Sequence, residues 1–323
     1  TVYPAGEPAQ DFVIVDDVSM TLEKGKVLGL IGESGAGKST IGLSAMGYGR
    51  GSIRLSGEVF VNGRDILKGG AAGLRKLRGK EVTYVSQSAA ASFNPAKKLM
   101  EQIIEAALEH GVANKEEAEK RAIRLFEELS LPEPDKIGNR YPHQVSGGQL
   151  QRAMTVMALV PEPDMIVFDE PTTALDVTTQ IDVLAAIKKA IRNTGVAALY
   201  ITHDLAVVAQ VSDEIMVLRN GAKIERNTAE NIINNPQEEY TKSLWAGVKV
   251  RRDGWKLKTK RRRREVRHGR WVRYNIALPE LASAERDQPS ESALPTSAGR
   301  GQPRESTLHP PSGRILIAER PSP

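Results

Sequence analysis

The sequence of 323 residues contains no cysteine. This absence excludes disulfide bonds, thiolate metal sites, iron–sulfur clusters and cysteine nucleophiles, and it is compatible with a cytoplasmic protein. No apolar run approaches the roughly 20 residues that span a bilayer, and no secretory signal opens the sequence. Any role at a membrane is therefore expected to depend on a partner protein.

Most of the chain has no excess of basic residues, although the net charge of the whole sequence is +5. Residues 1–250 contain 28 Lys and Arg against 32 Asp and Glu, a net charge of −4. Residues 251–323 contain 17 against 8, a net charge of +9. The larger part thus lacks the basic surface typical of nucleic-acid-binding proteins, and we expect no nucleic acid partner for it.

The character of the sequence changes after Val250. Arg261–Arg264 is a run of four arginines, and residues 279–323 are rich in Pro, Ser, Ala, Arg and Glu without apolar periodicity. We predict that residues 251–323 form a basic, disordered tail that contributes nothing to catalysis. A frameshift in the gene is one hypothesis for this composition. The alternative is an ordinary basic tail that binds anionic lipid or nucleic acid.

Residues 1–250 show the alternating strands and helices of an α/β domain with a largely parallel sheet. A turn at Glu23-Lys24-Gly25 is predicted to join the first two strands, and Asn62-Gly63 to join the next pair. Helical periodicity between about residues 97 and 160 predicts an inserted helical subdomain. The predicted strands are 12–15, 27–31, 57–61, 81–86, 165–168, 197–201 and 215–219, and the predicted helices are 100–110, 115–129, 149–159, 181–192 and 204–211.

A complete G-x-x-x-x-G-K-[S/T] pattern follows the apolar run at residues 27–31. A strand, a glycine turn and a helix start in this order aim backbone N–H groups at a polyphosphate, so the pattern predicts a phosphate-binding loop (P-loop). Lys38 can reach the β- and γ-phosphates, and the Ser39 hydroxyl can bind Mg²⁺. The alternative is a flexible loop that matches by chance. The predicted ATP-binding residues are Gly32, Glu33, Ser34, Gly35, Ala36, Gly37, Lys38, Ser39 and Thr40.

Two acidic residues, Asp169 and Glu170, end the apolar run at residues 165–168. A buried strand that ends in carboxylates places them beside the phosphate-binding loop of a neighbouring strand. We predict that Asp169 binds Mg²⁺, directly or through water, and that Glu170 polarises the attacking water. The alternative is an acidic cap on the next segment.

A second candidate phosphate-binding turn comprises Ser146, Gly147, Gly148 and Gln149, at the start of a predicted helix. Free N–H groups at a helix start bind anions, and the Ser146 hydroxyl adds a donor. A simple helix cap explains Ser146 equally well. Since the chain already contains a phosphate-binding loop, we predict that this turn contacts the nucleotide held by another subunit.

With these motifs in this order, the chain resembles the ATP-binding subunit of ABC transporters over about residues 3–247. The resemblance implies a P-loop NTPase core with a mostly parallel sheet, an antiparallel β edge and an inserted helical subdomain. It also implies that Gln87 contacts Mg²⁺ and the attacking water, that His203 contacts the γ-phosphate and that Asp176 lies in a loop at the dimer interface. Tyr3 would stack on adenine. Without the other motifs, Gln87 could equally be an ordinary surface glutamine. In the same way, His203 could be a structural histidine at a strand end.

Two segments are similar to the dipeptide, oligopeptide, nickel and opine importer branch of the family. They are Ser92–Pro95 and Asn235–Leu244, although Gln237-Glu238-Glu239 replaces the usual His-Pro before Tyr240. The cysteine-bearing C-terminal segment of many branch members is absent.

The resemblance implies an ATPase that uses ATP and Mg²⁺ to power uptake of peptides or related small solutes. Its expected partners are a second ATPase subunit, identical or not, two membrane permease subunits and, indirectly, an external solute-binding protein. Its expected location is the cytoplasmic face of the cell membrane. The alternatives are a soluble ABC-type ATPase that acts on nucleic acid or ribosomes, with residues 251–273 as the contact arm, and half of an exporter.

Overall fold

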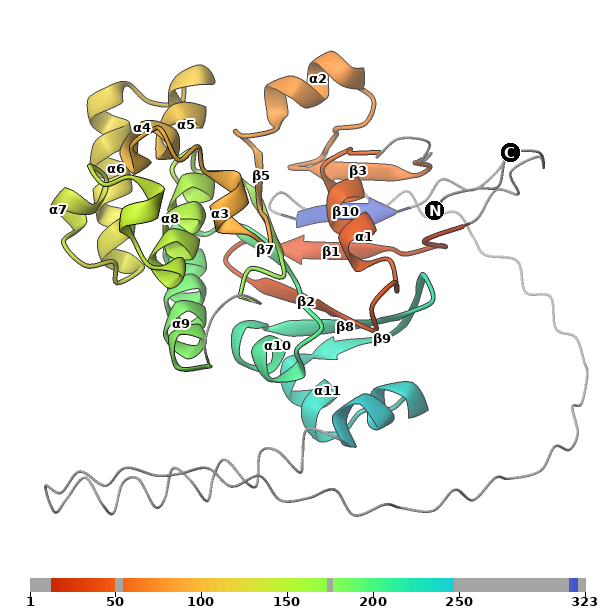
Figure 1. Cartoon of the computed structure of the whole chain (residues 1–323). Helices are drawn as coiled ribbons and strands as arrows, with labels where there is room; N and C mark the ends of the chain where they lie inside the picture. The colour runs from red at the N-terminus through yellow and green to blue at the C-terminus, as the bar shows by residue number, and fades with distance from the viewer. Residues whose placement is uncertain (1–12, 50–54, 173–176, 247–313, 319–323) are drawn as a thin grey trace, which may run out of the picture. The chain divides into compact units, whose positions relative to one another are not determined.

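A six-stranded sheet forms the centre of the domain (Figure 1). The computed structural model describes residues 13–49, 55–172, 177–246 and 314–318. The strand order is β5-β6-β7-β2-β8-β9, and all neighbours are parallel except β8 and β9. The strands are β2 (Val27–Ile31), β5 (Val82–Val85), β6 (Met165–Asp169), β7 (Ala197–Ile201), β8 (Glu214–Arg219) and β9 (Ala222–Thr228).

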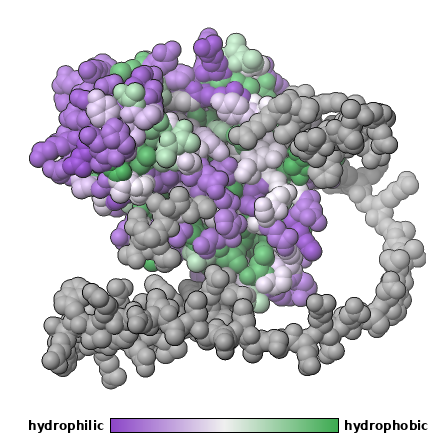
Figure 2. Space-filling view, viewed as in Figure 1, coloured by the Kyte–Doolittle hydropathy of each residue, from purple (hydrophilic) through white to green (hydrophobic). Residues whose placement is uncertain are grey.

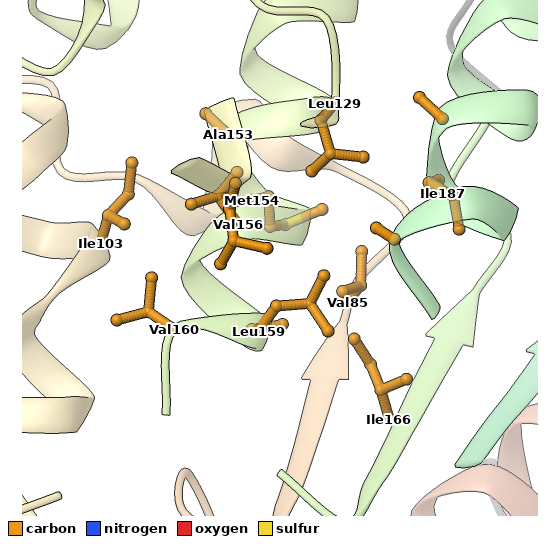
Figure 3. Packing of buried hydrophobic residues seen from close by; sticks show 14 of the residues in the cluster. Val85, Ile103, Leu129, Ala153, Met154, Val156, Leu159, Val160, Ile166 and Ile187 are labelled. Carbon is orange, nitrogen blue, oxygen red and sulfur yellow. The ribbon is translucent and has the colours of Figure 1, made fainter. Parts of the chain in front are cut away.

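Both faces of this sheet are covered, which explains why β2, β6 and β7 are buried at every residue and are apolar except for Asp169 at the end of β6. On one face, Val167 and Ile201 share a hydrophobic cluster with Ile41 of α1 (Lys38–Ala45). On the other face, Ile166 and Val85 pack against α8 (Gly147–Leu159) and α9 (Val177–Thr194) (Figure 3). The site residues predicted from the sequence lie where these strands end.

The predicted helical subdomain is a group of short helices around α8. The amphipathic helix α6 (Lys115–Glu128) buries Ala118, Ala122 and Phe126 in it, and Figure 2 shows mostly hydrophilic residues on the outer surface of this group. The other members are α3 (Ala89–Ser92), α4 (Leu99–Ile103), α5 (Glu105–Glu109), α7 (Pro134–Ile137) and the 3₁₀ turn Pro142–Gln144. The remaining helices of the described residues are α2 (Gly70–Leu77), α10 (Leu205–Val211), α11 (Ala229–Asn234) and residues 239–246.

A smaller antiparallel sheet has the order β1-β10-β3-β4. Its strands are β1 (Met20–Glu23), β3 (Glu58–Val61), β4 (Arg64–Asp65) and β10 (Arg314–Ala318). Strand β10 lies between β1 and β3 and pairs with both. Five residues of the predicted disordered tail are therefore part of the sheet, and the rest of the tail lies outside the described residues.

One strand prediction and one pairing prediction were wrong. Residues 13–15 are irregular, because the chain there crosses Gly221, whose carbonyl accepts the Asp16 N–H at 3.0 Å. Residues 57–61 and 81–86 do not pair: the Asn62-Gly63 turn joins β3 to β4, and β5 pairs in parallel with β6. The predicted helix at 100–110 is divided into α4 and α5 at Ile104.

The position of β10 predicts a stability effect for a change in the tail. Proline at Leu316 removes a backbone donor from the middle of a three-strand ladder, and we expect a loss of at least about 2 kcal/mol in the free energy of unfolding, measured by urea denaturation. Ser292→Pro, in the tail before β10, is the matched control. Equal unfolding curves for the two variants would show that β10 contributes nothing to the folded unit.

Candidate nucleotide site

The predicted phosphate-binding loop connects β2 to α1. Gly32 and Gly37 both have positive φ, 157° and 91°, and a Cβ at either would collide with its surroundings: Gly32 with the Leu218 carbonyl oxygen at 2.3 Å and Gly37 with the Val15 side chain at 2.8 Å. Gly37 is the N-cap of α1 and has no side chain, so it makes no capping hydrogen bond to the first N–H groups of the helix. The first N–H groups of the helix are thus available to an anion at the mouth of the loop.

Lys38 occupies the centre of this loop. Its ammonium group donates to the backbone carbonyls of Gly32 at 2.9 Å and Glu33 at 2.8 Å, and only 7% of the residue is exposed. Burial lowers the pKa of Lys38 from its ordinary value, while the carboxylates of Glu170 and Asp169 act in the opposite direction. A phosphate bound in the loop would supply the negative charge that this buried cation requires.

Asp169 faces the start of α1. Its Oδ1 accepts a hydrogen bond from the Ser39 hydroxyl at 2.9 Å, and the residue is only 9% exposed. Two oxygens at this separation match neighbouring ligands of an octahedral Mg²⁺, which lie about 3 Å apart when each bond is ~2.1 Å. The described residues contain no cluster of three or more His, Asp or Glu suited to a metal. The Ser39 and Asp169 oxygens would supply two ligands of a bound Mg²⁺.

Glu170 turns away from Asp169 toward His203. Its φ of 48° ends the strand, while its N–H still donates to the Ile201 carbonyl at 2.9 Å. Its Oε1 lies 2.8 Å from the His203 Nδ1. His203 itself is held by its neighbours, since Thr202 accepts the Asp204 N–H and Asp204 caps α10. The carboxyl ends of β6 and β7 thus bring a carboxylate and an imidazole together at the mouth of the loop.

Ser146 caps α8, as the simpler of the two sequence interpretations predicted. Its Oγ accepts the Gln149 N–H at 3.3 Å, and the Gln149 Oε1 accepts the Ser146 N–H at 3.0 Å. Ser146 and Gly147 are nevertheless exposed, and a methyl group added to Gly147 would meet nothing within 4 Å. The turn therefore presents a helix start with open space in front of it, and Figure 1 shows α8 among the helices, away from α1.

Of the other predicted residues, Gln87 lies in the described part of the chain, whereas Tyr3 and Asp176 do not. Gln87 is exposed two residues beyond β5, next to the strand that ends in Asp169. One residue of the site, Tyr84, was not predicted from the sequence; its hydroxyl donates to Asp169 at 2.8 Å. The available signal was strand alternation, which places Tyr84 and Asp169 on the same face of the sheet.

The two branch-like segments are anchored by buried side chains. After α3, the Gln102 side chain accepts the Asn94 N–H at 2.7 Å and donates to the Asn94 carbonyl at 3.1 Å, which ties the loop beyond Gln87 to α4. Directly after the other segment, Trp245 is 3% exposed and belongs to the same hydrophobic cluster as Ile31 of β2. The helical residues 239–246 thus support the strand that precedes the phosphate-binding loop.

Comparisons with known proteins agree with this geometry. Residues 15–173 match the family model described as ABC transporter. The chain is 38% identical over 246 residues to the metal-staphylopine import system ATP-binding protein CntD of Staphylococcus aureus, covering 76% of this chain and 91% of that protein. It is 36% identical over 241 residues to the oligopeptide transport ATP-binding protein OppD of Escherichia coli, covering 75% and 72%.

The solved structures that are similar to this chain include ABC transporter cassettes. The dimeric structure of MJ0796, a bacterial ABC transporter cassette, matches with a TM-score of 0.57 and 26% identity over 67% of this chain and 90% of that one. A dimeric post-hydrolysis state of the same cassette bound to ADP and Pi matches with a TM-score of 0.59 and 26% identity over 70% and 94%.

Proposed function

This chain belongs to the family of ABC transporter ATP-binding proteins, and we propose that it powers the import of peptides or of metal chelates of similar size. It is the ATP-hydrolysing subunit of an ABC importer. The relatives named above are assigned to metal-staphylopine and oligopeptide import. The observation that supports ATP hydrolysis is the meeting of Lys38, the Ser39–Asp169 pair and the Glu170–His203 pair at one edge of the sheet. The solute class rests on the two relatives.

In the proposed site, ATP lies with its phosphates in the loop between β2 and α1. Lys38 and the free N–H groups of α1 would bind the β- and γ-phosphates, and Ser39, Asp169 and Gln87 would hold Mg²⁺. When bound, Mg²⁺ would neutralise negative charge that develops during phosphoryl transfer. The buried Lys38 cation and the 2.9 Å Ser39–Asp169 contact support this assignment.

We propose that Glu170 orients the attacking water and accepts its proton. The His203 contact of 2.8 Å holds the carboxylate at the mouth of the loop. The other face of His203 would then meet the γ-phosphate, since this side chain is 55% exposed. Catalysis in such a site depends on position and electrostatics more than on covalent chemistry.

We further propose that two subunits close head to tail over two ATP molecules. ABC cassettes act as dimers, and the solved relative is dimeric. Ser146, Gly147, Gly148 and Gln149 of one subunit would complete the site of the other, with Asp176 at the interface. The exposed helix start of α8 supports this arrangement. The second subunit can be an identical chain or a related one.

The remaining proposals concern the membrane. None of the helices within the described parts of the chain has the length and apolarity needed to cross a bilayer. We propose that the subunit lies on the cytoplasmic face of the cell membrane against two permease subunits, which receive solute from an external binding protein. ATP closes the two ATPase subunits and hydrolysis releases them, which would drive the permeases between their two states.

Uptake measurements test the proposed solute class. Deletion of the gene is expected to abolish uptake of a labelled peptide or of a labelled metal chelate, and a plasmid copy of the wild type should restore it. A plasmid copy of Glu170→Gln should not. Normal uptake of both solute types in the deletion strain, with salt-sensitive RNA binding by the purified protein, would favour the nucleic-acid alternative instead.

A further inference from the structure

The tyrosine at position 84 contacts the proposed metal ligand directly. Its hydroxyl donates to Oδ2 of Asp169 at 2.8 Å, while Oδ1 of the same carboxylate accepts from the Ser39 hydroxyl at 2.9 Å. Each oxygen of this buried carboxylate therefore accepts a hydrogen bond from a different side chain. Charge-assisted hydrogen bonds of this kind are stronger than neutral ones.

The sheet register explains how Tyr84 reaches this position. In the parallel pair β5–β6, Tyr84 lies opposite Val167, and Asp169 follows Val167 by two residues on the same face. That face also packs against α1, where Ser39 lies. The Tyr84 ring belongs to the edge of the hydrophobic cluster on this face. Its hydroxyl is thus carried to the strand end by a side chain that is itself fixed by packing.

This arrangement restricts rotation of the carboxylate. If Asp169 turned about its Cβ–Cγ bond, Oδ2 would leave the Tyr84 hydroxyl and Oδ1 would leave the position next to Ser39. Partners behind a metal ligand commonly set its orientation, and their removal typically weakens metal binding 10–100-fold.

We propose that Tyr84 is a positioning residue that holds Asp169 with Oδ1 directed to the Mg²⁺ that accompanies ATP. This inference depends on the proposed Mg–ATP site. In this role Tyr84 would act on the metal through its hydrogen bond to Asp169. A change at Tyr84 should therefore alter the Mg²⁺ requirement of nucleotide binding and leave binding without metal unchanged.

The test is a Mg²⁺ titration of the binding of a fluorescent ATP analogue to the full-length protein. In Tyr84→Phe, we expect the Mg²⁺ concentration for half-maximal enhancement of binding to rise about tenfold, with affinity in EDTA unchanged. Tyr48→Phe is the matched control, because Tyr48 is 42% exposed and its ring contact with Arg78, 3.5 Å from the ring centre, survives the change. The half-maximal Mg²⁺ concentration is the midpoint of each variant's own titration, so a smaller folded fraction lowers the signal and does not move the midpoint.

A double-variant comparison separates positioning from packing. With Asp169→Ala in place, Tyr84→Phe should have no further effect on the Mg²⁺ requirement. An unchanged requirement in Tyr84→Phe, or an equal change with and without Asp169, would overturn the inference about Tyr84. If Mg²⁺ fails to enhance binding even in the wild type, the proposed Mg–ATP site itself is wrong.

Discussion

Replacing Glu170 with glutamine is expected to abolish ATP turnover and to leave ATP binding intact. Glutamine has the shape of glutamate and can keep the His203 contact, but it cannot accept a proton from water. We expect kcat to fall at least about 100-fold, while the affinity for Mg–ATP stays within about twofold of the wild type. Because we propose that hydrolysis reopens the dimer, the variant should also accumulate as a closed dimer in the presence of ATP, measured by size-exclusion chromatography with light scattering.

Two other variants separate a loss of catalysis from a loss of ATP binding. Glu127→Gln, an exposed position on α6, is the matched control and should keep wild-type turnover. Lys38→Ala should instead weaken ATP binding, since the buried ammonium group is the cation at the centre of the loop. Near-normal hydrolysis by Glu170→Gln would remove Glu170 from catalysis, and undiminished affinity in Lys38→Ala would count against the phosphate-loop assignment.

Replacing Ser146 with arginine is expected to block hydrolysis without affecting ATP binding to a single subunit. The bulky cation would fill the open space before α8, where we propose that the neighbour's γ-phosphate lies. We expect turnover to fall at least about 100-fold, in the range found when a donor to the reacting group is lost. ATP affinity, measured below the concentration at which dimers form, should change by less than about twofold.

Ser146→Ala separates the roles of this residue. Alanine removes the cap of α8, at a cost of about 1 kcal/mol in stability, but it leaves the space in front of the helix open. It should therefore retain much more activity than Ser146→Arg. Loss of ATP binding by the Ser146→Arg monomer would show that the turn serves the site of its own chain.

The sheet and most of the site could be predicted because the signals are local. Continuous apolar runs identified β2, β6 and β7, which are buried on both faces, and parallel strands bring their carboxyl ends to one edge. The same logic predicted that Lys38 and Asp169 would lie close together. The cap geometry of Ser146 was also predicted, and the role of its turn in a second subunit remains a prediction.

The failures concern pairings that no local pattern specifies. Asn62-Gly63 signals a tight turn, but it does not say whether the returning strand is β4 or a later one. The pairing of β10 with β1 joins residues almost 300 positions apart, and the short apolar stretch at 315–318 gives no sign of its partner. Tyr84 was missed because its contact depends on register and on the length of a side chain.

Mixing two inactive variants tests the shared site most directly. In a head-to-tail dimer of Lys38→Ala with Ser146→Arg, one site receives an intact phosphate-binding loop from the Ser146→Arg chain and an intact Ser146 turn from the Lys38→Ala chain. We expect a 1:1 mixture to recover about a quarter of wild-type ATPase activity, because half of the dimers are mixed and each keeps one of two sites. Either variant alone should stay inactive. A mixture as inactive as its components would contradict a site built from two copies of this chain.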